Sequence, residues 1–289
     1  MAVVSKVCMV TGATSGLGLA TAWQLAGLGA TVIIVGRDAA KCAAVAASVS
    51  SGSPTGAVDW LVADFADQDA VRRLAAEAEE RHPRIGVLVN NAGATYPKRR
   101  VTPEGVERTL AVNHLAPFLL TTLLLDRLRE SAPARIVNVS SVAHESARFD
   151  FDDPAMERGY RPFAAYGRSK LANLWFTYEL ARRLEGSGVT VNAVHPGLVR
   201  TALGDHSGAV RRAGWRLLHV AYRKHSLSAK EGAEAISHLA TAPELEDVTG
   251  RYFVRRRPAE SSPASRDTVA AARLWELSEE LTCARSTIG

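Results

Sequence analysis

Cysteine, lysine, aromatic residues and long apolar runs are all scarce in this 289-residue chain. The three cysteines are scattered, odd in number and form no Cys-x-x-Cys pair, which excludes a disulfide framework and suits a reducing compartment. No run of about 18 apolar residues occurs, so we expect no membrane span. The first ten residues carry one lysine and lead directly into Thr11 and Gly12, so we expect no signal peptide. The sequence therefore predicts a cytoplasmic protein, and nothing in it predicts a metal site.

The positive charge is carried almost entirely by arginine. Of the 35 basic residues six are lysine and 29 arginine, and the net charge is +5 with a pI near 9.3. The short basic clusters at 98–100, 211–212 and 255–257 lie far apart and have no aromatic residues between them. This distribution favours a solvated basic face over a nucleic-acid partner, which stays the weaker alternative.

Short apolar runs alternate with longer helical stretches along the chain. Apolar strands that alternate with helices predict a parallel sheet covered on both faces, and therefore a doubly wound α/β fold of about seven strands. No linker is evident, so we expect one domain over 1–289, with a lid at about 202–224, a surface segment at 258–265 and a C-terminal helical segment at 265–283. The strands are expected at 6–10, 31–35, 58–62, 85–89, 135–139, 190–194 and 251–254. The helices are expected at 16–28, 39–48, 67–81 (capped by Asp67), 102–129 (from Thr102-Pro103-Glu104), 164–184, 229–242 and 266–281.

The turn after the first strand is rich in glycine and leads directly into a helix. Glycines let the backbone approach a pyrophosphate, and the helix N-terminus offers free N–H groups and a positive dipole. The spacing is Gly-x-x-x-Gly-x-Gly, and a structural turn without a ligand is the alternative. The residues expected to hold the phosphates are Gly12, Thr14, Ser15, Gly16, Leu17 and Gly18.

The second strand ends in Gly36-Arg37-Asp38, which bears on the type of dinucleotide. An acidic residue at this strand end usually binds the ribose hydroxyls, whereas an arginine suits a 2′-phosphate. Arg37 therefore favours NADP(H), with Ser15 as a further donor to that phosphate. Because Asp38 stands at the same strand end, NAD(H) remains the less favoured cofactor. The alternative for Arg37 is that it is an ordinary surface residue that binds no cofactor.

The next two strand ends carry further polar residues. Asp64, with Phe65 beside it, is placed to accept from the adenine amino group, and helix capping is its competing role. Asn90-Asn91-Ala92-Gly93 closes the fourth strand. Its buried polar side chains need partners, which a cofactor edge and neighbouring strands would supply. We expect Asn90, Ala92 and Gly93 to line the cofactor.

Tyr166 and Lys170 stand four residues apart at the start of a helix, so they project from the same face. The pKa of a tyrosine is near 10, and a lysine ammonium and an oxidised nicotinamide close by would stabilise the phenolate. Ser141, after the fifth strand, and Asn113, on the helix after the fourth, belong to the same carboxyl edge of the sheet. Ser140 is the rival of Ser141, because adjacent strand residues point to opposite faces.

In this order, these motifs resemble the short-chain dehydrogenase/reductase family, which has a single Rossmann-fold domain. The retinol-dehydrogenase-like branch is the most similar within it. The resemblance rests on Thr11-Gly12-x3-Gly16-x-Gly18, Asn90 to Gly93, Val112 to Leu115, Ser141 with Ala143-His144, Tyr166-x3-Lys170, Ser169 to Asn173 and His195-Pro196-Gly197. Two departures are Ala116-Pro117, where the branch usually has Gly-His, and a longer loop at 149–161.

The resemblance also implies a role for each site residue. Tyr166 would be the general acid/base, and Lys170 would hold the nicotinamide ribose and lower the tyrosine pKa. Ser141, chosen over Ser140 on family precedent, would orient the substrate oxygen. Asn113 would hold a water through its backbone. Val199 and Thr201, which follow the Pro196-Gly197 turn, would hold the nicotinamide carboxamide, and Pro196 is also expected to bind the cofactor.

The expected function is therefore an NADP(H)-dependent oxidoreductase that acts on a lipophilic carbonyl or alcohol. Specificity would lie in the loop 149–163 and the lid 202–224, which carries Trp215 and Tyr222 among basic residues. The helices at 113–129 and 164–184 are apolar on more than one side, so a homodimer or homotetramer through them is expected. A non-catalytic NADP(H)-binding regulatory protein is the alternative.

Overall fold

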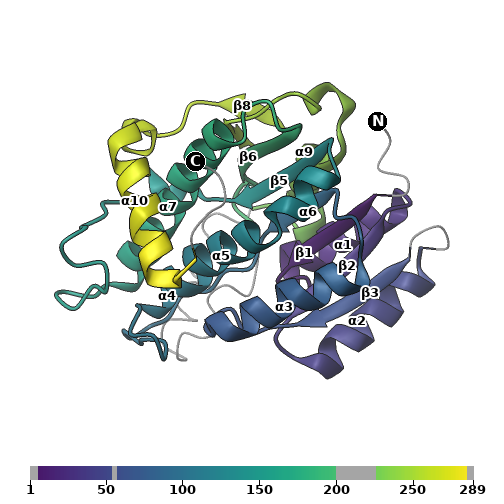
Figure 1. The fold of residues 1–289 in the computed structure, drawn as a ribbon, viewed down its shortest axis with the longest axis horizontal. Coiled ribbons are helices and arrows are strands. Elements are labelled where there is room, and N and C mark those ends of the chain that lie inside the picture. Colours follow the sequence, from purple (N-terminus) through teal and green to yellow (C-terminus); the bar gives the residue numbers. More distant parts are fainter. Residues whose placement is uncertain (1–5, 54–56, 200–225, 285–289) are drawn as a thin grey trace.

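Apolar strands and helices alternate along the chain and build one eight-stranded sheet of order β3-β2-β1-β4-β5-β6-β7-β8 (Figure 1). The computed structural model describes residues 6–53, 57–199 and 226–284. Seven strands run parallel, and β8 pairs antiparallel with β7. The strands are β1 Val7–Thr11, β2 Thr31–Gly36, β3 Val58–Val62, β4 Val87–Asn90, β5 Ala134–Val139, β6 Val189–His195, β7 Arg251–Val254 and β8 Arg257–Ala259. The helices are α1 Gly16–Gly27, α2 Ala39–Ser51, α3 Gln68–Arg81, α4 Arg108–Leu110, α5 Ala116–Leu123, α6 Leu125–Glu130, α7 Pro162–Arg183, α9 Ala229–Thr241 and α10 Thr268–Thr282.

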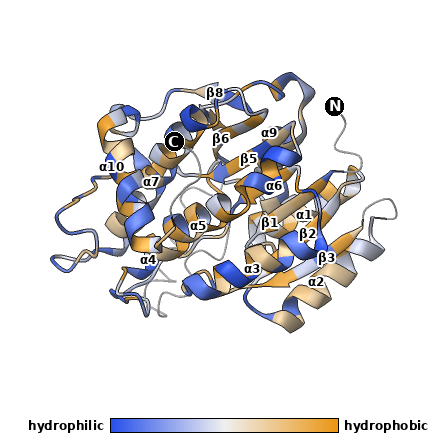
Figure 2. Cartoon of the chain, viewed as in Figure 1, coloured by the Kyte–Doolittle hydropathy of each residue, from blue (hydrophilic) through white to orange (hydrophobic). Residues whose placement is uncertain are grey.

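The sheet separates two hydrophobic layers, because successive strand residues point to opposite faces. In β1, Met9 packs into the cluster formed with α3, α5 and α7. Its neighbours Cys8 and Val10 pack into the cluster formed with α1, α2 and α9. Figure 2 shows hydrophobic colours along the strands and hydrophilic patches on the outer helix α3. The expected doubly wound Rossmann fold is therefore confirmed.

The strand order places β1 beside β4, with β2 and β3 on one side and β5 to β8 on the other. The connections run in opposite directions from this point, so a crevice opens outside the carboxyl ends of the two strands, where ligands bind in such sheets. The glycine turn follows β1, and the Asn-Asn-Ala-Gly segment follows β4. The fold therefore brings the two segments to one edge.

The helix expected to begin at Thr102-Pro103-Glu104 begins instead at Arg108, so that prediction is wrong. Residues 102–106 form a turn in which the Thr102 N–H donates to the Val106 carbonyl and Gly105 has a φ of +81°. The buried carboxylate of Glu107 caps the helix by accepting from the Thr109 and Leu110 N–H groups. The start of this helix is therefore set by the capping carboxylate of Glu107 and not by Pro103.

Two features near the C-terminus also differ from expectation. The short strand β8 was not expected from the sequence. It follows a tight turn in which Arg255 has a φ of +58°. This conformation is uncommon for residues other than glycine, so the run of arginines does not indicate a turn. Residues 258–265 were expected to wrap the surface, and most of them are exposed, but Ser261 and Ser265 are buried. The other described strands and helices begin and end within three residues of their expected positions.

Helix α10 covers α7, and its Trp275 is the centre of their contact. The Trp275 ring centroid lies 5.0 Å from that of Phe118 on α5, and the Arg183 guanidinium lies 4.3 Å above it. Residues 113–129 and 164–184 are all described, and none of their large hydrophobic side chains is exposed. The predicted dimer through these helices therefore has no exposed apolar surface of theirs to use, and a homodimer or homotetramer stays a prediction.

Trp275→Ala should lower the free energy of unfolding by about 3–5 kcal/mol, because it leaves a cavity between α10, α5 and α7. Val269→Ala is the matched control, since Val269 lies on the same helix and is 76% exposed. We expect that variant to stay within about 0.5 kcal/mol of the wild type. Equilibrium urea unfolding followed by circular dichroism measures both. Equal losses for the two variants would contradict this account of α10.

Candidate active site

The glycine turn has the shape that a pyrophosphate requires. Gly12 and Gly16 have φ values of +66° and +55°. A Cβ on Gly18 would lie 2.4 Å from the Gly12 carbonyl oxygen, so only glycine lets the helix pack this closely on the turn. Ser15 precedes α1 without a side-chain cap, and the first turn of α1 contains no acidic residue. The helix N–H groups are thus left for an anion.

Leu17 and Val199, expected to bind the cofactor from distant parts of the chain, meet beside α9. A Cβ on Gly232 would lie 2.5 Å from Val199 Cγ2 and 2.7 Å from Leu17 Cδ2. Thr14 packs against Gly36 at the end of β2, where a Cβ would lie 2.5 Å from Thr14 Cγ2. Pro196 is buried beside this group, and Thr201 lies outside the described residues, as does the predicted lid at 202–224.

The two candidates for the adenosine ribose are in different situations. Asp38 is the N-cap of α2, and its Oδ1 accepts from the Lys41 N–H at 3.0 Å. Arg37 is exposed and makes no hydrogen bond or ion pair with any described residue. The Asp38 carboxylate is therefore engaged as a helix cap, whereas the Arg37 guanidinium is available to bind a ligand.

Asp64 is held in the turn between β3 and α3, and the N-cap of α3 is Asp67, so the helix-capping alternative for Asp64 is wrong. The Oδ1 of Asp64 accepts from the Ala66 N–H at 3.0 Å, and its Oδ2 lies 3.6 Å from the Arg108 guanidinium. Arg108 in turn stacks on the Tyr96 ring at 5.2 Å. Phe65 is buried in the hydrophobic cluster with α3 and α5, and its role beside the adenine stays a prediction.

The segment after β4 binds mainly to the sheet itself. The Asn90 amide donates to Thr121 and to Asn138, so its donors are satisfied by the protein rather than by a cofactor edge as expected. Thr11 Oγ1 accepts from the Ala92 N–H at 3.0 Å, which fixes the segment against β1. A Cβ on Gly93 would lie 3.5 Å from Asn113 Oδ1 and 3.7 Å from Lys170 Nζ. Gly93 therefore leaves a space that opens toward the lysine.

Ser141 and Tyr166 are brought together at the carboxyl edge. The Ser141 side chain lies near enough to the Tyr166 hydroxyl to lower its pKa. The rival Ser140 is buried, and its hydroxyl donates to the Lys170 carbonyl at 3.1 Å. A Cβ on Gly167 would lie 2.8 Å from the Ala143 carbonyl oxygen, so the serine turn packs directly on the backbone of α7.

Lys170 is buried one turn below Tyr166. Its Nζ donates to the Val139 carbonyl at 2.9 Å and lies 5.6 Å from the centroid of the Tyr166 ring. Burial lowers the pKa of Lys170 to about 8. Burial also raises the pKa of Tyr166 to about 12, against the lowering effect of the Ser141 side chain. In the protein alone desolvation is the larger effect. The lowered tyrosine pKa, expected from the lysine together with a bound oxidised nicotinamide, stays a prediction.

Asn113 lies in a π-helical segment, Ala111–Leu115. Its side chain accepts from the Ala94 N–H at 2.7 Å and donates to the Ala94 carbonyl and to Ser169 Oγ. Pro117 has no N–H, so the Asn113 carbonyl lacks the donor that an α-helix supplies four residues further on. The side chain is therefore fully used in the structure, and Pro117 withholds one α-helical donor from the backbone carbonyl to which the family resemblance assigns a water.

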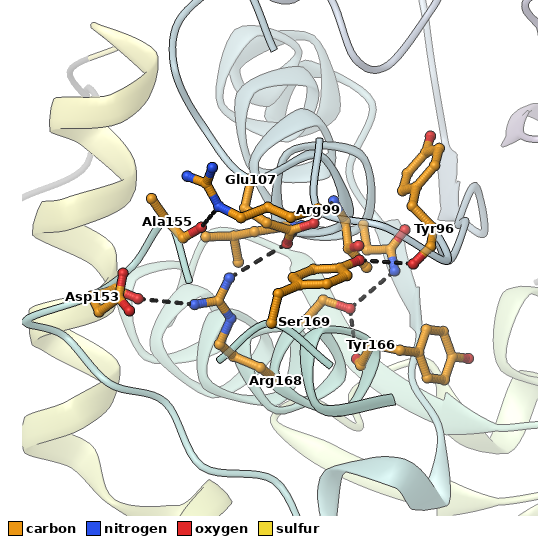
Figure 3. Close-up of polar contacts among 12 residues, drawn as sticks. Tyr96, Arg99, Glu107, Asp153, Ala155, Tyr166, Arg168 and Ser169 are labelled. Atoms are coloured by element: carbon orange, nitrogen blue, oxygen red, sulfur yellow. Dashed lines mark hydrogen bonds and ion pairs between the residues drawn. The ribbon is translucent and has the colours of Figure 1, made fainter. Parts of the chain in front are cut away.

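A buried ion pair lies on the side of α7 opposite Tyr166 (Figure 3). Arg168 Nη2 is 3.4 Å from Glu107 Oε2, and both side chains are buried. Arg168 also donates to the Asp153 carbonyl and stacks on Phe149, so it holds part of the loop 149–161 to the helix. Loss of one member of such a pair leaves a buried charge without compensation.

Several residues of the site were not singled out from the sequence. Ser169 accepts from Asn113 and donates to the Tyr166 carbonyl at 2.7 Å, and its helical spacing from Tyr166 could have indicated this. Gly167 and Gly232 allow neighbouring segments to pack closely against their helices. Such contacts cannot be predicted from a single sequence. The Val139 carbonyl could not be predicted, because every strand residue has one.

Comparison with known proteins agrees with this geometry. Residues 6–211 match the family described as short chain dehydrogenase, so the chain belongs to the short-chain dehydrogenase/reductase family. It is an oxidoreductase of alcohol or carbonyl groups, and the family binds NAD or NADP. Within the family it is retinol-dehydrogenase-like: human retinol dehydrogenase 13 is 41% identical over 286 residues, with 96% of this chain and 84% of that protein covered.

Two solved structures extend the comparison. An uncharacterized protein from Mycobacterium Paratuberculosis has a TM-score of 0.79 and 34% identity, with 99% of this chain and 96% of that chain covered. A short chain dehydrogenase from Burkholderia cenocepacia J2315, in complex with NADP, has a TM-score of 0.70 and 27% identity, with 88% and 97% covered.

Two absences concern the described residues alone. Across residues 6–53, 57–199 and 226–284, no three or more His, Cys, Asp or Glu side chains are grouped to hold a metal ion. None of the helices in these ranges combines the length and apolar character that a membrane crossing requires.

Lys170→Met should change how stability depends on pH. Between about pH 8 and pH 10.5 an unfolded lysine still holds the proton that buried Lys170 has lost, so the unfolding free energy of the wild type gains from this residue as pH rises. The variant lacks this gain, which amounts to on the order of 3 kcal/mol. Urea unfolding at pH 7.5 and pH 10.5 measures it, with exposed Lys230→Met as control. Parallel pH profiles for wild type and Lys170→Met would contradict the burial cost.

Proposed function

We propose that this protein is an NADP(H)-dependent reductase of a lipophilic aldehyde or ketone, with Tyr166 as its general acid. The observation that carries the proposal is that Tyr166 lies beside a buried Lys170, on a helix that packs directly against the turn that carries Ser141. Desolvation keeps the phenol protonated at neutral pH, and a protonated phenol is the form that donates to a carbonyl oxygen.

The side chains divide the chemistry among them. A bound nicotinamide would supply the hydride to the carbonyl carbon. Ser141 Oγ accepts from the Ala143 N–H, so its own proton is free to orient the substrate oxygen beside Tyr166. Tyr166 gives its proton to that oxygen as negative charge develops there. Lys170 stabilises the resulting phenolate, and a water on the Asn113 carbonyl would pass the replacement proton.

The preference for NADP(H) rests on the second strand end. A 2′-phosphate needs a cationic donor, and Arg37 is exposed and unpaired among the described residues. NAD(H) would need the Asp38 carboxylate, which already caps α2. The related Burkholderia dehydrogenase was solved with NADP, which agrees with this preference.

A lipophilic substrate is supported by the apolar side chains around the site. Val142 follows Ser141, Phe163 lies one turn before Tyr166, and Leu198 follows the Pro196-Gly197 turn. All three are large hydrophobic residues that are exposed at the carboxyl edge of the sheet. The named relatives are retinol dehydrogenases, and a retinoid is one substrate of this chemical class.

Tyr166→Phe should reduce carbonyl turnover by about 10²–10⁴-fold while NADPH binding is unchanged, because it removes the proton donor and keeps the ring. The measurement is NADPH oxidation with a panel of lipophilic and small charged carbonyls, together with NADPH titration by fluorescence. Tyr252→Phe is the control, since its buried hydroxyl has no hydrogen-bond partner among the described residues. Normal turnover by Tyr166→Phe would remove the catalytic assignment. Tight NADPH binding by a wild type that reduces nothing would favour the regulatory alternative.

Arg37→Ala should weaken NADPH binding by about 10–100-fold and leave NADH binding unchanged, because one charge-assisted contact to the 2′-phosphate is lost. Lys41→Ala removes a nearby exposed charge on α2 and serves as the control. Fluorescence titration of the cofactor-free proteins gives both dissociation constants. Tighter binding of NADH than NADPH by the wild type would refute the role of Arg37.

A further inference from the structure

His144 lies three residues after Ser141 and is fully buried. Its Nδ1 is 2.6 Å from the Ser141 carbonyl oxygen, which also accepts from the His144 backbone N–H at 3.1 Å. On the other side of the ring, Nε2 lies 3.2 Å from the backbone nitrogen of Ser262. The imidazole therefore joins the serine turn to a segment 118 residues further along the chain.

The two partners determine the tautomer of this ring. A carbonyl oxygen only accepts, so Nδ1 carries the proton and donates it to Ser141. A backbone N–H only donates, so Nε2 is unprotonated and accepts from Ser262. His144 is thus the neutral Nδ1–H form, and neither nitrogen is free for proton transfer.

Residues 260–266, here called the C-terminal strap, are attached to α7 by two further side chains. The Tyr178 hydroxyl is 2.6 Å from Ser261 Oγ, and Trp175 Nε1 donates to the Ala264 carbonyl at 2.9 Å. Ser265 Oγ donates to Ser261 Oγ at 2.7 Å, which closes the strap on itself. The strap is therefore fixed to the same helix that carries Tyr166 and Lys170.

These contacts form a closed path from one catalytic hydroxyl to the other. Ser141 is bound to His144, His144 to the strap, and the strap to α7, which presents Tyr166. Gly167 on α7 also packs directly against the serine turn at the Ala143 carbonyl. The turn is thus held by two contacts, one with Gly167 of α7 and one through His144 with the strap.

We propose that His144 is a positioning residue, which through Ser262 sets the Ser141 hydroxyl against Tyr166 for proton donation. The proposal rests on the proposed function, because it assumes that Ser141 orients the substrate oxygen. Two N–H groups on the Ser141 carbonyl fix its peptide plane, and this plane sets the direction of the Ser141 side chain. A displacement of about 1 Å is enough to cost on the order of 10²-fold in rate.

Two substitutions test the path from its two ends. His144→Phe keeps a buried ring and removes both nitrogens. Ser262→Pro removes the one N–H that reaches His144, and Ser262 already has the φ of −57° that proline needs. Ser262→Ala is the matched control, because it removes the hydroxyl and keeps the N–H. His144→Asn keeps a donor for Ser141 without an atom at the Nε2 position, so it replaces Ser262→Pro if the proline variant does not fold.

We expect His144→Phe and Ser262→Pro each to lower kcat for carbonyl reduction by at least about tenfold, with an unchanged NADPH dissociation constant. The double variant should be no slower than His144→Phe alone, because both act through one contact. Ser262→Ala should match the wild type. In ¹⁵N spectra of the wild type, the histidine signal that His144→Phe removes should be that of an Nδ1–H tautomer.

Three results would overturn the proposal: normal kcat in His144→Phe, losses that multiply in the double variant, or an Nε2–H tautomer for His144. These are distinct from failure of the proposed function. If the wild type reduces no carbonyl, or Tyr166→Phe is fully active, the proposed function fails. If both of those controls behave as expected and the His144 variants are normal, only the positioning role is wrong.

Discussion

Burial of the Lys170 ammonium at the carboxyl edge of the sheet is the constraint on which the rest of the site depends. A buried lysine is costly, and its pKa near 8 reflects that cost. The cost is partly offset by the Val139 carbonyl, which the end of β5 leaves free to accept from Nζ. The lysine is thus placed where the end of β5 lies beside α7. The same position brings its helix into contact with the serine turn that follows that strand.

The same desolvation acts on Tyr166 with the opposite consequence. Burial disfavours a charge on either group, so it lowers the lysine pKa and raises that of the phenol. Each pKa unit corresponds to about 1.4 kcal/mol, so a phenolate at neutral pH would need several such units from new positive charge. In the protein alone the neutral phenol is the stable form, which suits donation to a carbonyl more than abstraction from an alcohol.

Much of the fold and part of the site could be predicted from the sequence, and the limits have physical causes. Apolar strand runs, the glycine turn and the four-residue spacing of Tyr166 and Lys170 are local patterns, and the structure places them as expected. The helix start at Arg108 depends on a buried Glu107 that pairs with Arg168, a residue far along the chain. The use of Asp38 as a helix cap is a local contact with the Lys41 N–H that the sequence could have indicated, as it did for Asp67. The raised pKa of Tyr166 depends on surroundings that one sequence does not contain.

The replacement of Gly-His by Ala116-Pro117 illustrates how a departure from the family pattern can be compatible with the chemistry. A proline inside a helix costs stability because it removes one hydrogen bond and crowds the preceding turn. Here the turn before it is π-helical, a geometry often found at functional sites, which gives the ring space. The carbonyl that loses its α-helical donor belongs to Asn113, whose side chain is already fully bonded. The proline therefore removes one N–H that an α-helix would direct at the Asn113 carbonyl, the atom to which the proposed proton path assigns a water.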